Sequence, residues 1–418
     1  MHWEVTLMTD NKKVPRLRFK EFTDAWEQRK LNDEYQKIGN AFVGTASPYY
    51  VENGHFYLES NNIKNGQINH DHEIFINDSF FKKQADKYLH TGDLVMVQSG
   101  HVGDTAVITK KYNNTAAHAL IMFRNPKHDA TSTFLNYYFQ SDNAKSKISV
   151  LSIGNTISHI LASDMSRFTV SFPKNVEQEK ITKLFSSLQN LITLHQRKQN
   201  QLKKVKKALL QKMFADEKNP FPFIRFKGFT EAWEQRKLGE VSTIVGGGTP
   251  STKNSAYWGG TINWYSPAEI DDQIYVNNSQ RKITELGLSK SSASLLPIGT
   301  VLFTSRAGIG KTAILGKKAC TNQGFQSIIP NKKELDSYFV YTMTAQLKRY
   351  GETHGAGSTF VEVSGKQMAK MPVVLPKYEE QIQISFTFKQ LDSLVALHQR
   401  KLDQLQKLKK SLLQNMFI

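Results

Sequence analysis

The sequence of 418 residues contains a single cysteine, Cys320. One cysteine excludes an intramolecular disulfide framework and any zinc site built from several cysteines, and it suits a reducing cytosol. No stretch approaches the ~20 apolar residues that a membrane-spanning helix needs. The segment from Met1 to Lys13 lacks the apolar core of a secretory signal peptide. These absences predict a soluble, cytoplasmic protein.

The sequence also lacks a convincing catalytic or cofactor motif. Ser305–Thr312 is close to a phosphate-binding loop, but serine stands where the first glycine is required. Its lysine, Lys311, corresponds to Asp104 in an internal repeat, and a carboxylate would repel phosphate. We therefore predict a tight turn between strands. Residues 218–222, Lys-Asn-Pro-Phe-Pro, loosely match a DNA amino-methyltransferase motif, but no glycine-rich cofactor loop is found, so a linker is the favoured interpretation.

The run His70–Glu73 contains side chains that can bind metals. Neighbouring residues on a strand point to opposite faces, so such a run rarely closes on one ion. We interpret it as a solvated loop. No nucleophile with an adjacent base is evident either, although residues far apart in sequence could still form such a set.

The composition has a strong basic excess. The formal net charge is +18 and the isoelectric point is about 9.6. An excess of this size indicates a polyanionic partner, most often nucleic acid. The alternative is a basic surface without a partner.

Two stretches of the chain occur twice. Residues 18–31 and 225–238 are identical at 12 of 14 positions, and residues 194–214 and 397–417 agree at 15 of 21. Repeats of this length indicate a domain duplication rather than a solenoid. The ends of each unit are alike, whereas the roughly 140 residues between them look largely unrelated. Similar ends are expected if both copies bind the same kind of partner. Different middle regions are expected if each copy recognises something different.

Two segments, 177–214 and 379–417, are predicted to be long helices. Neither contains glycine or proline, and both have a heptad pattern, which predicts a coiled coil. A helix of ~38 residues would be roughly 57 Å long. Asn175 with Gln178 is predicted to cap the first helix, and Pro220 stops it. The predicted inner positions are Ile181, Leu184, Leu188, Leu191, His195, Lys198, Leu202, Val205 and Leu209 in the first helix, and Ile384, Thr387, Leu391, Leu394, His398, Lys401, Leu405, Leu408 and Leu412 in the second.

The regions between the repeats have short β-prone runs separated by Gly, Asn and Ser clusters, which is typical of an α+β domain. Such runs are Leu94–Val97, 106–108, Val301–Phe303 and 373–375. Polar side chains between these runs are suited to base edges and phosphates, and glycine loops allow the backbone to approach a duplex. In the first unit the DNA-binding candidates are Ser60, Asn61, Asn62, Lys64, Gln98, Ser99, His101, Asn155 and Thr156; in the second they are Gly247, Thr249, Ser251, Asn263, Ser266, Arg306, Asn322, Gln323, Ser358 and Thr359.

Three features together resemble the specificity subunits of type I restriction–modification systems. They are the repeated Arg-Phe-x-x-Phe-x-x-x-Trp-Glu-x-x-Lys-Leu stretch, the region from Gly246 to Trp264, and the helices with Leu-His-Gln-Arg-Lys and Leu-Leu-Gln-x-Met-Phe. The resemblance covers essentially the whole chain. The first unit departs from the pattern, because it lacks a Gly-Gly-Thr-Pro loop and has Gly39–Gly44 nearby. Residue-level transfer is therefore weaker in that unit.

The resemblance implies two similar α/β target-recognition domains separated by two antiparallel coiled-coil helices, in a pseudo-two-fold repeat. The implied boundaries are a first target domain at 1–173, a helix at 174–215, a linker at 216–224, a second target domain at 225–376 and a helix at 377–418. Each domain would read one half of a bipartite DNA site, and this chain would have no active site. The helices would set the gap and dock two methyltransferase subunits, through Leu188, Leu191, His195, Leu202, Leu209, Leu391, Leu394, His398, Leu405 and Leu412.

The resemblance also implies that cofactors sit on partner subunits. S-adenosylmethionine would be bound by the methyltransferases, and ATP and Mg²⁺ by motor-nuclease subunits. Two other classes remain open at this point: a self-contained DNA methyltransferase or nuclease, and a coiled-coil scaffold that does not read DNA. Methyl transfer by the chain alone would identify the first class. Absence of sequence-specific binding in the presence of partner subunits would identify the second.

Overall fold

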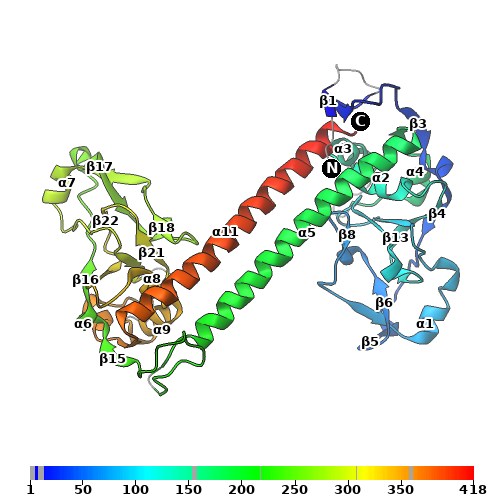
Figure 1. The fold of residues 1–418 in the computed structure, drawn as a ribbon. Coiled ribbons are helices and arrows are strands. Elements are labelled where there is room, and N and C mark those ends of the chain that lie inside the picture. The colour runs from blue at the N-terminus through cyan, green and yellow to red at the C-terminus, as the bar shows by residue number, and fades with distance from the viewer. Residues whose placement is uncertain (1–4, 8–13, 153–157, 217, 307, 357–360) are drawn as a thin grey trace. The chain divides into compact units, whose positions relative to one another are not determined.

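The computed structural model describes residues 5–7, 14–152, 158–216, 218–306, 308–356 and 361–418 (Figure 1). The chain forms two compact units. Unit 1 contains Met1–Gln196 and Arg400–Ile418, and unit 2 contains Arg197–Gln399. Each unit therefore combines one α+β domain, the predicted target domain, with parts of both long helices, α5 (Asn175–Lys212) and α11 (Tyr378–Asn415). The two long helices that the heptads predict are confirmed.

Unit 1 is built on two four-stranded sheets, with strand orders β11-β10-β13-β4 and β12-β6-β9-β5, and a two-stranded sheet β14-β3. Its elements are β1 (Val5–Leu7), β2 (Leu17–Phe19), β3 (Glu27–Lys30), β4 (Tyr35–Asn40), β5 (Tyr50–Val51), β6 (His55–Leu58), β7 (Ile63–Lys64), β8 (Gln67–Ile68), β9 (Ile74–Ile76), α1 (Asp78–Lys82), β10 (Leu94–Val97), β11 (Thr105–Val107), β12 (Ala116–Ala117), β13 (Leu120–Pro126), α2 (Thr131–Tyr138), α3 (Asp142–Leu151), α4 (Ala162–Arg167) and β14 (Thr169–Phe172).

Unit 2 repeats this architecture with sheets β16-β23-β20-β21-β18, β19-β17-β22 and β15-β24. Its elements are β15 (Glu234–Lys237), α6 (Leu238–Val241), β16 (Ser242–Gly246), β17 (Trp258–Tyr265), β18 (Tyr275–Val276), β19 (Arg281–Ile283), α7 (Glu285–Ser289), β20 (Val301–Phe303), β21 (Thr312–Leu315), β22 (Ala319–Thr321), β23 (Gln326–Pro330), α8 (Ser337–Thr342), α9 (Thr344–His354), α10 (Gly365–Ala369) and β24 (Pro372–Leu375).

The predicted strands are confirmed: Leu94–Val97 and Val301–Phe303 are β10 and β20, 373–375 lies in β24, and 106–108 overlaps β11. All four residues of β10 are buried, as are the three of β20. Continuous burial of this kind is typical of central strands covered by helices or by a second sheet. The segment from Ser305 to Lys311 is the turn of the β20–β21 hairpin, in which Thr304 N donates to Lys311 O. The sequence correctly predicts a connection between strands here, but the connection is longer than a tight turn, and Ala307 within it lies outside the described residues.

The first repeated stretch is tied to the start of each long helix by a bidentate ion pair. In unit 1, Arg18 Nε and Nη2 donate to the two carboxylate oxygens of Glu177, at 2.7 and 2.8 Å. In unit 2, Arg225 makes the same pair with Glu380 at 2.8 Å for both bonds. Both glutamates are buried, so each needs this partner. The repeat in the sequence is therefore a repeat of domain–helix attachment.

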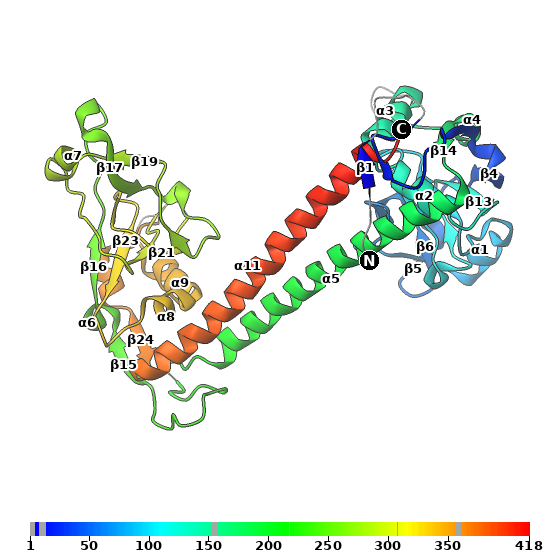
Figure 2. The same ribbon diagram turned by 45° about the horizontal axis from the view of Figure 1, so that its top comes forward.

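The second repeated stretch completes the core of the opposite target domain. Phe417 at the end of α11 packs against Phe134 and Phe185 in unit 1, with ring centroids 5.4 and 5.6 Å apart. Its counterpart Phe214, after α5, packs in unit 2 against Phe339 at 5.3 Å and against Phe388 at 6.2 Å. Figures 1 and 2 both show the red end of α11 beside the first half of α5.

The repeated tryptophans belong to the same aromatic clusters. Trp26 lies 5.8 Å from Phe134, and Trp233 lies 5.9 Å from Phe214. Both tryptophans are more than nine-tenths buried. Their place in the repeat therefore follows from folding rather than from base recognition.

The face along which α5 and α11 contact each other, here called the seam, differs from the predicted heptad at every second position. Within each unit α5 and α11 run antiparallel, with Lys409 beside Gln189 in unit 1 and Lys206 beside Asp392 in unit 2. The predicted inner residues Leu191 and Leu394 are 45% and 43% exposed. The observed inner positions are Ile181, Phe185, Leu188, Ile192, His195, Gln199, Leu202, Lys206, Leu209 and Met213 in α5, and Ile384, Phe388, Leu391, Val395, His398, Leu402, Leu405, Lys409, Leu412 and Met416 in α11.

The predicted cap of α5 is also wrong. Asn175 lies inside the helix, and the backbone N–H of Gln178 donates to Lys174 O. The side chain of Gln178 instead donates to Pro173 O at 3.1 Å. Its counterpart Gln381 donates to Pro376 O at the same distance, so this bond is also part of the repeat.

A lysine occupies equivalent seam positions in the two units, with different partners. In unit 2, Lys206 pairs with Asp392. In unit 1 the residue at the position of Asp392 is Gln189, and Lys409 donates to the amide oxygens of Gln140 and Gln189, both at 2.9 Å. Burial without a carboxylate partner lowers the pKa of Lys409 to about 8.

We expect Phe417→Ala to destabilise unit 1 and Phe214→Ala to destabilise unit 2. Removing a buried phenylalanine ring typically costs about 3–5 kcal/mol, and less where the ring is only partly buried, as for Phe214. Hydrogen-exchange protection, followed separately in each unit, measures the effect. Phe386, which is 62% exposed on α11, provides the control, and Phe386→Ala should leave both units unchanged. Loss of protection in unit 2 alone after Phe417→Ala would contradict this packing.

We expect Gln189→Asp to stabilise unit 1 at neutral pH, because it gives Lys409 the carboxylate that Lys206 has. The folded-state pKa of Lys409 is lowered, so the unfolded chain binds more protons between about pH 8 and 10.5. The destabilisation is therefore complete below pH 8 and disappears as the pH rises through that window. Denaturant unfolding at pH 7 and pH 10 should show an advantage for Gln189→Asp and for Lys409→Met that shrinks at the higher pH. Equal differences at both pH values would contradict the assignment to Lys409.

Candidate DNA-recognition interface

Three loops of unit 2 meet around a cavity of about 420 Å³. They are the turn after β17, the connection after β22, and the β20–β21 hairpin. The cavity is lined by Ser266, Pro267, Ala268, Arg306, Gly308, Lys311 and Asn322. Three of the predicted DNA-binding residues, Ser266, Arg306 and Asn322, are therefore brought together from segments up to 56 residues apart in sequence.

The polar groups of this cavity are neutral or cationic. Asn322 accepts from Gly324 N through its side-chain oxygen at 2.8 Å, and its side-chain NH₂ has no partner among the described residues. Among the described residues, the ion pairs of Arg306 and Lys311 are long, at 3.7 Å with Glu362 and 3.8 Å with Asp271. An amide donor beside two half-exposed cations is suited to base edges and phosphates.

The glycine loop after β16 lies against this cavity because only glycine fits there. A Cβ on Gly247 would lie 1.9 Å from Asn322 O. Gly248 N donates to Thr321 O, and the indole N–H of Trp264 donates to Gly248 O at 2.8 Å. These bonds place Thr249 beside Gln323, to which its hydroxyl donates at 2.6 Å. Thr249, Ser251 and Gln323 thus extend the polar surface.

One predicted DNA-binding residue of unit 2 makes its hydrogen bonds inside the fold. Asn263 is 6% exposed, donates to Asn277 O and accepts from Ser279 N, so it lies beneath the surface. Trp264 is buried, and Trp258 stacks under the guanidinium of Arg281 at 3.6 Å. Ser358 and Thr359 lie outside the described residues.

The candidates of unit 1 are less concentrated. Asn62 is 1% exposed and donates to His72 O at 2.9 Å, and Gln98 is 5% exposed. Asn61 and Lys64 are exposed, and Ser60 is half-buried. Ser99 makes a 2.6 Å hydrogen bond with His159. Asn155 and Thr156 lie outside the described residues.

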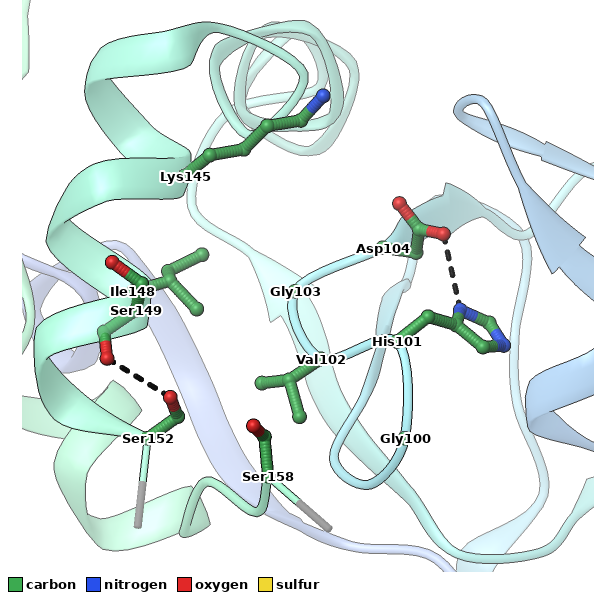
Figure 3. A pocket seen from close by; sticks show the side chains of 10 residues that line it. All are labelled: Gly100, His101, Val102, Gly103, Asp104, Lys145, Ile148, Ser149, Ser152 and Ser158. Atoms are coloured by element: carbon green, nitrogen blue, oxygen red, sulfur yellow. Dashed lines mark hydrogen bonds and ion pairs between the residues drawn. The ribbon is translucent and has the colours of Figure 1, made fainter. Parts of the chain in front are cut away.

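A second cavity, of about 360 Å³, lies between the loop after β10 and helix α3 (Figure 3). Val102 and Ile148 extend into it from opposite sides, and Lys145 lies at its upper edge in the view. His101 points away from it and bonds to Asp104 at 3.0 Å. The predicted candidate His101 therefore contributes backbone, not its ring, to this cavity.

Hydrogen-bond patterns show which residues of unit 1 correspond to the cavity of unit 2. In unit 1, β12 pairs with β6 so that Ala117 faces Leu58, and in unit 2, β22 pairs with β17 so that Thr321 faces Tyr265. The next residues are Glu59 and His118 in unit 1, and Ser266 and Asn322 in unit 2. Likewise, Phe42 N donates to Ala117 O as Gly248 N donates to Thr321 O. In the hairpin, Ser99 and Asp104 correspond to Arg306 and Lys311.

Glu59 and His118, which are not among the residues predicted from the sequence, form a connected cluster with Tyr50. Glu59 Oε1 accepts from Tyr50 at 2.8 Å and contacts His118 Nδ1 at 3.0 Å, and His118 Nε2 lies 2.9 Å from Gly44 O. The hydrogen bond with Glu59 raises the pKa of His118. Burial alone would raise the pKa of Glu59, but bonds from His118 and Tyr50 hold it below its ordinary value. No sequence similarity marks these residues.

The remaining motifs supply no alternative site. His70 bonds to Glu73 and to the hydroxyl of Tyr112, in an exposed loop. In the ranges that the structure describes, three His, Cys, Asp or Glu side chains nowhere gather closely enough to hold a metal ion. The same ranges contain no helix that is both long and apolar enough to cross a membrane.

The family of the chain follows from comparison with known proteins. Residues 23–204 and 230–407 match the model of the type I restriction modification DNA specificity domain, so the match covers both units. The chain belongs to this family. The family resemblance inferred from the repeated motifs is thereby confirmed.

Relatives in the family differ in how much of the chain they match. The MjaIX specificity subunit of a type I restriction enzyme of Methanocaldococcus jannaschii is 35% identical over 189 residues, which is 44% of each chain. The alignment thus spans less than half of that relative. The putative MjaX specificity subunit from the same organism is 24% identical over 94% of this chain and 93% of that one.

Solved structures of the family share the fold. A type I restriction–modification S subunit from M. genitalium matches with a TM-score of 0.64 at 14% identity, covering 97% of this chain and 99% of that one. A chain from a study of type I complex assembly matches with a TM-score of 0.51 at 17% identity, covering 93% and 96%. The predicted α+β architecture with two similar domains and two long helices is therefore confirmed.

Proposed function

We propose that this chain is the DNA-recognition subunit of a type I restriction–modification complex, in which each unit reads one half of a bipartite site. One observation carries the proposal. The two units share a scaffold down to individual hydrogen bonds, yet their equivalent loop positions differ in chemistry. Unit 2 presents Ser266, Asn322 and Arg306 where unit 1 presents Glu59, His118 and Ser99. A duplicated scaffold with different side chains at one site is suited to reading two different sequences.

The net charge of +18 supports a duplex DNA ligand, because phosphate contacts supply most of the sequence-independent affinity. We assign no catalytic role to the chain. Methyl transfer would come from two methyltransferase subunits that bind S-adenosylmethionine. Cleavage would come from motor-nuclease subunits that use ATP and Mg²⁺.

The long helices provide a repeated surface for the methyltransferase subunits. Apolar residues that face away from the seam recur in both units, and such residues are unfavourable in water without a partner. In unit 1 they are Leu191, Leu194 and Leu408, and in unit 2 they are Leu394, Leu397 and Val205. Each residue of one set occupies the repeat position of a residue of the other. This duplication supports the binding of two copies of one partner.

Exchange of residues 32–172 for those of a relative with a different target should change one half of the methylated motif only. The reading loops of unit 1 lie within this segment, whereas Arg18 and Glu177, which attach the domain to α5, lie outside it. Sequencing of methylated bases in a host genome determines both half-sites. The reciprocal exchange of residues 239–371 is the matched control and should change the other half. A change in both halves after either exchange would contradict separate reading by the two units.

We also propose that the helices set the gap between the half-sites. Seven residues inserted after Gln199 in α5 and after Gln399 in α11, which are hydrogen-bond partners, preserve the seam. The insertion adds roughly 10 Å of helix, or up to about three base pairs at ~3.4 Å each. The methylated motif should keep both halves and gain gap positions. Seven residues inserted into the linker 216–224 should leave the motif unchanged. An unaltered gap in the helix variant would exclude the helices as the spacer.

A further inference from the structure

The cluster of Glu59, Tyr50 and His118 has a geometry that leaves one acceptor site of the carboxylate available. Glu59 Oε1 receives both the Tyr50 hydroxyl at 2.8 Å and the His118 ring at 3.0 Å. The turn also directs the backbone N–H of Asn62 at the Glu59 side chain. A carboxylate has about four acceptor sites, so three donors leave one of them. The side chain is 15% exposed, so its orientation is fixed while one acceptor stays accessible.

The histidine is held in a matching way. His118 Nε2 faces the carbonyl oxygen of Gly44, which can only accept, and Nδ1 faces Glu59. Both ring nitrogens therefore face acceptors, which favours the doubly protonated ring. An imidazolium beside Glu59 balances the carboxylate charge and holds its pKa low. The cluster thus keeps Glu59 ionised, so that its carboxylate accepts hydrogen bonds and cannot donate them.

The position of the cluster is that of the cavity in unit 2. Glu59 precedes a short turn at Ser60–Asn62, as Ser266 precedes a turn at Pro267–Glu269. The side chain at the third turn position accepts from the backbone N–H of Glu59 in unit 1 and of Ser266 in unit 2. The scaffold therefore points Glu59 to the same place as the hydroxyl of Ser266.

An acceptor-only group discriminates among base edges. In the major groove, cytosine N4 and adenine N6 are the hydrogen-bond donors, whereas guanine and thymine offer only acceptors at the corresponding positions. A carboxylate also repels phosphates, so it has no use as a backbone contact in a chain with net charge +18. When a base presents an acceptor instead, the carboxylate loses water on binding without gaining a hydrogen bond, which costs binding free energy.

We propose that Glu59 is a specificity-determining residue of unit 1, which selects a base with an exocyclic amino group, with Tyr50 and His118 as positioning residues. This inference rests on the proposed function. Unit 2 has a short hydroxyl, Ser266, at the same place, so the requirement applies to one half-site only.

The test uses the full chain assembled with its methyltransferase subunits and duplexes that contain its methylated motif. In each duplex, one adenine or cytosine of the first half-site is replaced by purine or 2-pyrimidinone, which lack the amino group. Binding is measured rather than methylation, because the methylated adenine needs its own amine. At one position we expect about a tenfold or greater loss of affinity for the wild-type chain. The base at that position identifies whether adenine or cytosine supplies the amine.

Glu59→Gln links the effect to the residue. Its amide can donate as well as accept, so the variant should also bind duplexes in which guanine or thymine, with an acceptor at the corresponding place, replaces the selected base, which the wild-type chain rejects. It should keep the second half-site. Glu73→Gln is the matched control, because Glu73 is an exposed acid of unit 1 outside the cluster, and it should keep the wild-type pattern. His118→Asn retains Glu59 but removes the imidazole ring that orients its carboxylate. This variant should be less sensitive to amine removal without a change in the selected base. This variant also decides the outcome if Glu59→Gln does not fold.

Tolerance of every amine removal by the wild-type chain would overturn the proposal, and so would an unchanged pattern in Glu59→Gln. If Glu59→Gln does not fold, full sensitivity in His118→Asn would overturn it too. Failure of the proposed function gives a different result, since the assembled complex would then bind no duplex sequence-selectively.

Discussion

The structure depends on aromatic side chains that enter a core from the far end of the chain. Phe417 reaches the core of the first target domain across 283 residues from Phe134, and Phe214 closes the second core in the same way. Non-local contacts of this kind carry a loop-closure cost that the buried rings must offset. The paired helices and the Arg18–Glu177 and Arg225–Glu380 ion pairs hold each helix start against its domain. Each domain is therefore fixed by both long helices, and its candidate DNA-recognition loops project from a defined scaffold.

Much of this architecture was accessible from the sequence, because the repeats mark the attachment sites. The long helices and the strands Leu94–Val97 and Val301–Phe303 follow from periodicity and apolar runs. At alternate positions of the seam, the predicted residue precedes the observed one by one place in the sequence. Val205 and Leu408 were predicted because they are apolar, whereas the structure has Lys206 and Lys409 at these positions. Polar seam residues with partners from the other helix or from the domain cannot be identified from apolar periodicity alone.

The candidate interface was predictable only in part. Ser266, Arg306 and Asn322 were found because they follow apolar runs and have suitable chemistry. Asn263 has the same kind of side chain, but it forms its hydrogen bonds with residues inside the fold. Glu59 and His118 were missed because their equivalence to the second unit lies in strand pairing, not in residue identity. Side-chain type alone does not distinguish a group that faces solvent from one that closes a turn.

Unit 1 is built from two separate segments of the chain, and this affects the order in which the units fold during synthesis. Unit 2 is a continuous segment, Arg197–Gln399, whereas unit 1 needs Arg400–Ile418 to be complete. A ribosome releases the N-terminal part first, so the first target domain emerges with its core open and waits for the last residues of the chain. The second domain can close before the first. Until Phe417 arrives, the aromatic faces of Phe134 and Phe185 that it covers in the folded chain lack that cover.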